Sequence, residues 1–156
     1  MDIEYISKKG YEKLYEEYSN LDKEILAVQK EMGESSARDN DLRENPEFLE
    51  LRVKAMYNLP KKKEELFERY KKAQIIEETD EYKNFDGTTV ILGSQVELLF
   101  DGEIEFYKIL GKYDGNIEEQ ILSYEAPIAK AILGKKVNSE VQFNGIKIKI
   151  LSVKRI

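Results

Sequence analysis

Two carboxylates, Asp41 and Glu44, stand three residues apart in a polar stretch between two long heptad-patterned runs. Residues three apart share a face when the backbone turns helically, so both side chains can reach one ion. Carboxylate oxygens suit Mg²⁺, which usually accepts only one or two protein carboxylates and keeps several waters. Two acids are too few for an autonomous site but enough to complete one whose other ligands belong to another molecule. On residue types alone, an acidic turn is more often only solvated and favourable to the start of a helix.

The composition excludes several other kinds of chemistry. The chain of 156 residues contains no cysteine and no histidine, which removes disulfides, Cys/His zinc sites, thiol nucleophiles and His-based triads. Its net charge is −6, so it lacks the surplus of Lys and Arg that unaided binding to nucleic acid needs, and we expect no direct sequence-specific DNA binding. The N-terminus lacks a secretion signal and no apolar run could span a membrane. We therefore expect a cytoplasmic protein.

The first heptad run predicts a helix that begins after Ser7, a residue type favoured at the N-cap. Its apolar positions alternate at spacings of three and four, which is the pattern of a coiled-coil seam. The polar stretch at residues 33–36 predicts the end of this helix. The seam positions are Tyr11, Leu14, Tyr18, Leu21, Ile25, Val28 and Met32.

A second run of similar length follows the acidic turn, so the two runs are expected to form an antiparallel hairpin with its tip at residues 39–45. Pro60 lies inside this run, where it lacks a donor and crowds the carbonyl of Met56, which predicts a kink or local break. The alternative is that one helix ends near Asn58 and another begins at Pro60. The predicted seam positions are Leu49, Arg52 or Val53, Met56, Leu59, Lys63, Leu66, Tyr70 and Ala73.

Beyond an aperiodic polar linker at residues 77–84, the hydrophobic period changes to two. Strands are predicted at residues 88–92, 94–100 and 103–110, with a hairpin turn at Asp101 and Gly102. A short helix is predicted at residues 127–133, opened by its proline and closed by Gly134.

The chain ends in another predicted hairpin, which turns at Asn144 and Gly145 between residues 140–143 and the last strand. One face of that strand is expected to carry Ile146, Ile148, Ile150 and Ser152, and the other Lys147, Lys149, Leu151 and Val153. The fold class is therefore α+β. An antiparallel coiled-coil hairpin over residues 1–79 precedes a small antiparallel sheet domain with one short helix over residues 80–156.

The order of residues at the tip adds a resemblance. Residues 41–48, Asp-Leu-Arg-Glu-Asn-Pro-Glu-Phe, resemble the D-L-x-E-N-A-E-Y tip of the bacterial Gre transcript-cleavage factors, most closely the GreA type. Residues 10–17 are similar to the family's first-helix opening, and residues 73–76 to the end of its second helix. In the second half, residues 92–96, 107–111 and 126–135 are similar to the family's F-G-S-x-V, Y-x-I-V-G and S-P-I-A-R-A-L-L-G-K segments.

The resemblance implies an FKBP-like second domain that docks at the secondary-channel entrance of bacterial RNA polymerase, while the finger reaches toward the catalytic centre. There Asp41 and Glu44 would help hold a second Mg²⁺ and a water, so that the polymerase, and not this chain, cleaves backtracked RNA. The ion would be held jointly and not bound stably by the chain alone. Contacts with polymerase or the RNA 3′ end are expected from Asn45, Phe48, Lys61, Lys62 and Arg69, and docking from Pro127, Ile128, Lys130 and Gly134. From its residue type alone, Asn45 is expected to cap the second helix, and simple packing is the alternative for Phe48.

The approach to the tip departs from the family, because it is one residue shorter and has Asn40 in place of Gly. Asn tolerates a left-handed turn, so the hairpin can be kept. One alternative is an inhibitory Gre homologue that blocks the channel without promoting cleavage. Another is an FKBP-like peptide-binding or isomerase module whose coiled-coil arm dimerises. A hairpin that satisfies its own seam is expected to stay monomeric.

Overall fold

The computed structural model describes residues 2–39, 41–115 and 118–156, which form two compact units. The finger unit is Glu12–Lys71, and the sheet unit combines Met1–Tyr11 with Lys72–Ile156. The unit boundaries thus differ from the predicted division at residue 79. The reason is that β1 (Glu4–Ile6) pairs in parallel with β2 (Ala73–Ile75). This pairing also ends the second arm before Ala73, which was predicted to be helical.

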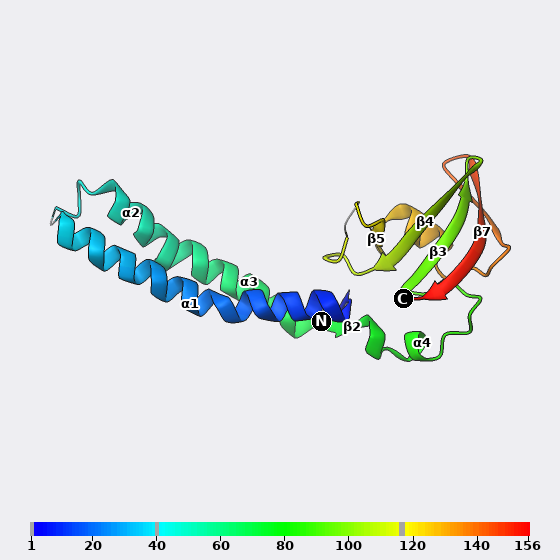
Figure 1. Ribbon diagram of the computed structural model, residues 1–156, viewed down its shortest axis with the longest axis horizontal. Coiled ribbons are helices and arrows are strands. Elements are labelled where there is room, and N and C mark those ends of the chain that lie inside the picture. Colours follow the sequence, from blue (N-terminus) through cyan, green and yellow to red (C-terminus); the bar gives the residue numbers. More distant parts are fainter. Residues whose placement is uncertain (1, 40, 116–117) are drawn as a thin grey trace. The chain divides into compact units, whose positions relative to one another are not determined.

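Two helical arms run antiparallel in the finger (Figure 1). The first is α1 (Lys8–Arg38), and the second consists of α2 (Pro46–Val53), the π-helical turn η1 (Lys54–Asn58) and α3 (Leu59–Lys72). The predicted N-cap is confirmed, since the Ser7 Oγ accepts the Gly10 amide N–H at 2.9 Å. The predicted end of α1 at residues 33–36 is wrong, because the helix continues to Arg38.

The buried side of α1 explains this continuation. Its buried residues, Leu14, Leu21, Val28 and Ser35, are spaced by seven throughout. Ser35 therefore occupies the next position of the seam and is 1% exposed. Its side chain has hydrogen-bond partners on the other arm. The buried hydroxyl is therefore satisfied.

The π-helical turn accommodates Pro60. The Leu59 amide bonds to the carbonyl of Lys54, five residues earlier. Because Pro60 has no N–H and its ring crowds the carbonyl of Met56, a regular α-helical turn is unfavourable here, and the wider turn keeps the arm helical. The predicted break thus takes the form of a π-turn. The alternative placed a helix boundary at Asn58, and α3 does begin next to it at Leu59, but helical residues continue without a gap from Pro46 to Lys72.

The π-turn also changes which residues of the second arm form the seam, because it inserts one residue into the helical repeat. Leu59 and Leu66 are buried as predicted, and Ala55 is the buried residue before them. The predicted seam positions before and within the turn are wrong: Leu49, Val53 and Met56 are exposed by 41%, 48% and 56%.

The start of α1 is anchored by Asp114, which follows β4 (Glu103–Leu110). The Asp114 carboxylate accepts the Ser7 amide N–H at 2.7 Å, the Ser7 hydroxyl at 2.8 Å and the Gly111 amide N–H at 3.0 Å. Gly111 is required at this point, because a Cβ there would overlap the carbonyl oxygen of Tyr5. This anchor fixes the N-cap of the first arm within the sheet unit.

The larger sheet has the strand order β5-β4-β3-β7-β6. It contains β3 (Ser94–Phe100), β5 (Ile121–Ser123), β6 (Glu140–Phe143) and β7 (Ile146–Arg155) together with β4. Both predicted hairpins are confirmed, and the two residues of each turn have positive φ, as a type I′ turn requires. The predicted antiparallel sheet is in fact mixed, because β5 pairs in parallel with β4.

One helix, α5 (Pro127–Ile132), packs on the inner face of this sheet and matches the predicted short helix. Its Ala129 and Ile132 join a core that includes Leu98, Ile148 and Ile150. The prediction for the last strand is wrong at its end, where Ser152 is exposed and Val153 is buried. A register shift between Glu97 and Leu98 on β3 moves these residues to the opposite faces.

Two further predictions for the sheet unit need correction. Residues 88–92 form no strand: only a single bridge joins Thr89 to Lys136, although Val90 and Ile91 are buried. The predicted linker is partly helical, with η2 (Ile76–Glu78) and α4 (Asp80–Lys83). Thr79 caps α4 by accepting the amide N–H of Tyr82 at 3.3 Å, so local capping chemistry gives this polar segment a defined path.

Candidate functional site

The predicted carboxylate pair begins and ends the turn that joins the two arms. The Glu44 amide donates to the Asp41 carbonyl oxygen at 3.1 Å, which is the hydrogen bond of a tight four-residue turn. The Asp41 Oδ1 accepts the Arg43 amide at 3.2 Å, an Asx-type contact. Both acidic residues are exposed. The predicted left-handed conformation of Asn40 lies outside the described residues.

The donor set of this turn suits a hard cation. The Glu44 side chain has no hydrogen-bond or ion-pair partner among the residues that the structure describes, and the second oxygen of Asp41 is likewise uncommitted there. Within the same ranges no group of three or more acidic side chains is placed to hold a metal. Two exposed carboxylates on a short turn therefore fit Mg²⁺ as a part of its ligand shell, with the remaining positions left to other donors.

Asn45 fixes the turn to both arms. Its side chain is 5% exposed, and its Oδ1 accepts the Phe48 amide N–H at 3.1 Å, which caps α2. Its Nδ2 donates to the Ser35 hydroxyl oxygen at 3.0 Å and to the Ser35 carbonyl at 3.3 Å. The predicted capping role is confirmed. The predicted contact with RNA or polymerase stays a prediction, and all of these hydrogen bonds lie within the finger.

An ion pair closes the same region. Arg38, the last residue of α1, donates from Nη2 to the Glu47 carboxylate at 2.9 and 3.1 Å. The Ser35 hydroxyl donates to the Glu47 Oε2 at 3.2 Å. We call Ser35, Arg38, Asn45 and Glu47 the tip clamp. The role of Ser35 was not predicted from the sequence, because its neighbours favour the end of a helix. Its heptad spacing from Val28 was the signal that could have indicated a buried seam position.

The basic residues predicted to contact RNA differ in their exposure to solvent. Lys61 and Lys62 are exposed on α3, whereas Arg69 is half-buried. Their neighbour Lys63 is paired with Asp22 of the first arm at 2.5 Å, and this hydrogen bond raises the pKa of the Lys63 ammonium above its ordinary value. Lys61 and Lys62 can meet a phosphate from solvent, while Lys63 mainly joins the two arms. The predicted contacts with RNA stay predictions.

The predicted docking residues lie together at α5. Pro127 begins the helix and is exposed, as is Lys130, while Ile128 is half-buried. Gly134 follows the helix with φ +78°, a left-handed conformation that favours glycine. The aromatic residue predicted to contact RNA or polymerase, Phe48, is half-buried on α2. The predicted contacts of these residues with polymerase stay predictions.

The chain is similar in sequence to known proteins. Residues 86–155 match the family model "Transcription elongation factor, GreA/GreB, C-term". The transcription elongation factor GreA of Novosphingobium aromaticivorans is 32% identical over 135 residues, which cover 86% of this chain and 82% of that protein. GreA of Nautilia profundicola is 33% identical over 155 residues, with 95% and 91% covered. The chain belongs to the GreA/GreB family of transcription elongation factors.

As a GreA/GreB family member, the chain is a transcription factor. A solved structure of GreA factor homolog 1 from Thermus thermophilus covers 99% of both chains at 18% identity, with a TM-score of 0.42. No helix in the described ranges of this family member is long and apolar enough to cross a membrane.

Proposed function

We propose that this chain docks on bacterial RNA polymerase, extends its finger into the secondary channel and stimulates the polymerase to cleave backtracked RNA. The observation that carries the proposal is the exposed Asp41 and Glu44 pair on a turn that the tip clamp holds. Family membership supports a role in transcription elongation. The position of the pair between two long helical arms supports a role at the end of the finger.

The chemistry asked of the chain is limited to the supply of ligands. Mg²⁺ held between two partners would promote attack of water on a phosphodiester and stabilise the leaving oxygen. Asp41 and Glu44 would supply carboxylate oxygens and bring negative charge to a centre whose other ligands belong to the polymerase. The tip clamp would hold the two residues in one turn geometry, which matters because positioning accounts for a large share of such a rate increase.

The test adds the full chain to stalled, backtracked transcription complexes in Mg²⁺ and measures short 3′ RNA fragments. We expect wild type to release fragments and Asp41→Asn with Glu44→Gln to lower the cleavage rate by about tenfold or more, because each change removes an anionic ligand. Glu50→Gln is a matched control, since it neutralises another exposed carboxylate of the finger. It should leave cleavage unchanged.

Three results would contradict the proposal. Binding of wild type to polymerase with slower elongation and no released fragments would favour an inhibitory homologue. The doubly substituted tip releasing as many fragments as wild type would remove the two carboxylates from the mechanism. If Glu50→Gln lowered the cleavage rate as much as the tip variant, the total negative charge of the finger, and not the two tip carboxylates, would explain the effect.

A further inference from the structure

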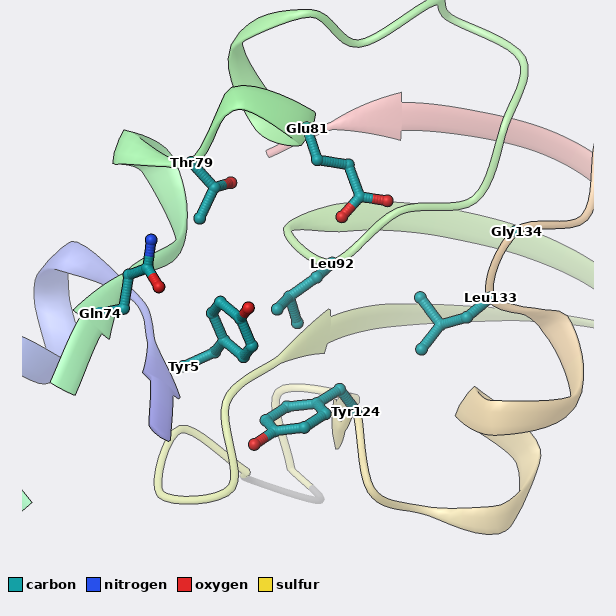
Figure 2. A pocket seen from close by; sticks show the side chains of 8 residues that line it. All are labelled: Tyr5, Gln74, Thr79, Glu81, Leu92, Tyr124, Leu133 and Gly134. Carbon is teal, nitrogen blue, oxygen red and sulfur yellow. The ribbon is translucent and has the colours of Figure 1, made fainter. Parts of the chain in front are cut away.

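The sheet unit contains a cavity of about 370 Å³ that the proposed function does not use. Figure 2 shows its walls, which come from β1, β2, the helical linker, the loop before β3, the residue that follows β5 and the two residues that follow α5. Such a volume lies at the small end of the range for ligand sites. The lining residues are Tyr5, Gln74, Thr79, Glu81, Leu92, Tyr124, Leu133 and Gly134.

Three polar groups border this cavity without a protein partner. The Glu81 carboxylate, the Gln74 amide and the Tyr5 hydroxyl have no hydrogen bond or ion pair to any residue within the described ranges. In Figure 2, the Glu81 carboxylate is directed toward the space above Leu92 and Leu133, and the Tyr5 hydroxyl lies beside Leu92 on the side away from Leu133. All three groups can accept hydrogen bonds. The cavity therefore presents acceptors around an apolar wall.

The electrostatic surroundings add negative charge. No Lys or Arg is among the described residues that line the cavity. Burial raises the pKa of the Tyr124 hydroxyl above its ordinary value, and the carboxylates of Glu125 and Glu4 add to the rise. Glu125 and Glu4 thus act electrostatically on Tyr124, and Glu81 is the carboxylate among the described lining residues. The charge within the lining therefore favours a cationic over an anionic ligand.

The aromatic walls favour a cation in particular. The rings of Tyr5 and Tyr124 meet edge to face, with centroids 5.8 Å apart and an interplanar angle of 85°. Tyrosine faces attract guanidinium and ammonium groups within about 6 Å. Leu92 and Leu133 offer apolar surface for the methylene stem that such a group carries. A neutral apolar ligand would leave the carboxylate and amide without partners.

We infer that this cavity is a binding site for an alkylguanidinium or alkylammonium group, with Glu81 as the anionic partner, Gln74 and Tyr5 as further acceptors and the two tyrosine rings as cation–π walls. The group can come from two sources, an arginine or lysine side chain on a partner protein or a free polyamine. The inference does not depend on transcript cleavage, because the site lies in the sheet unit and its lining includes no tip residue.

The experiment titrates the ¹⁵N-labelled full chain with three probes and follows amide shifts by NMR. N-acetyl-arginine methylamide represents a protein-borne cation, spermidine represents a free polyamine, and N-acetyl-glutamine methylamide is the neutral control. We expect saturable shifts at Tyr5, Gln74 and Glu81 with at least one cation and none with the neutral compound. Preference for the arginine compound assigns the site to a protein side chain, and preference for spermidine assigns it to a polyamine.

Glu81→Gln tests the anionic partner and should weaken cation binding by about tenfold or more, since it removes the charged acceptor. The change is nearly isosteric at an exposed side chain without partners, so the fold should be retained. Glu97→Gln is the matched control on β3, where the carboxylate bonds Ser152 instead. Absence of saturation with both cations, equal binding of the neutral probe, or an unchanged affinity in Glu81→Gln would overturn the inference.

Discussion

Replacing Asn45 by alanine should release the acidic turn from the finger while leaving both tip carboxylates in the sequence. The change removes the cap of α2, whose loss costs about 1 kcal/mol. It also removes two donor bonds to Ser35, at about 1 kcal/mol for the better of them and less for the longer. We therefore expect a loss of about 2–3 kcal/mol in the free energy of opening the tip.

The assay follows hydrogen exchange of the amides at Phe48 and Leu49 by NMR, because the chain has two units and a single unfolding transition would not isolate the tip. A loss of 2–3 kcal/mol corresponds to exchange faster by about 30- to 150-fold. Asn45→Asp keeps the capping oxygen and loses only the donors, so it should give an intermediate rate. Asn20→Ala, at an exposed position in the middle of α1, is the control and should change exchange little.

A double-mutant cycle with Ser35→Ala then separates the bond between the arms from the cap. If the hydrogen bonds to Ser35 contribute as described, the two substitutions should be non-additive by about 0.5 kcal/mol or more. The reasoning is refuted if Asn45→Ala changes tip opening by less than about 0.5 kcal/mol, or if the cycle is additive. The turn would then be held chiefly by the ion pair between Arg38 and Glu47.

Two further predictions concern the sheet unit. Asp114→Ala should speed hydrogen exchange of the Ser7 amide by about 30-fold or more, because it removes a charged acceptor shared by three donors; unchanged exchange would mean that the anchor is not required. The Thr89 hydroxyl, and then the amides of Thr88 and Thr89, lower the pKa of Asp86. Its unfolded pKa is near 3.9, so its stabilisation is present above about pH 4 and falls as the pH is lowered further. The free energy of unfolding, measured as a function of pH, should therefore fall less steeply below pH 4 in Asp86→Asn than in wild type. Parallel curves would show that Asp86 does not contribute to stability in this way.

Local signals in the sequence were sufficient for much of the fold. The hairpin turns at Asp101–Gly102 and Asn144–Gly145 need positive φ at adjacent residues, which these residue types tolerate, so the strands around them could be placed. The N-cap at Ser7 was predicted for a similarly local reason. By contrast, β1 and β2 are short strands from distant parts of the chain, and neither has an alternating pattern long enough to predict a pairing.

For the candidate site, the sequence predicted the spacing of Asp41 and Glu44 and the cap at Asn45, but it did not predict the tip clamp. Ser35 stands beside Gly33 and Ser36, which favour the end of a helix, and its partners lie on the other arm. The sequence also did not predict that the buried seam passes through Ala55. Pro60 predicts a disturbance, but residue types alone do not say whether the arm bends, breaks or takes up an extra residue.

The buried positions of α1 change from aliphatic at Leu14, Leu21 and Val28 to polar at Ser35. Aliphatic layers tolerate a slip of the arms by one heptad, because one branched side chain can replace another. A polar layer does not, since a slip would place Asn45 against the aliphatic Val28 layer and leave its amide unsatisfied. The last layer of the finger therefore specifies the alignment of the arms, and with it how far the two carboxylates project beyond the helical pair.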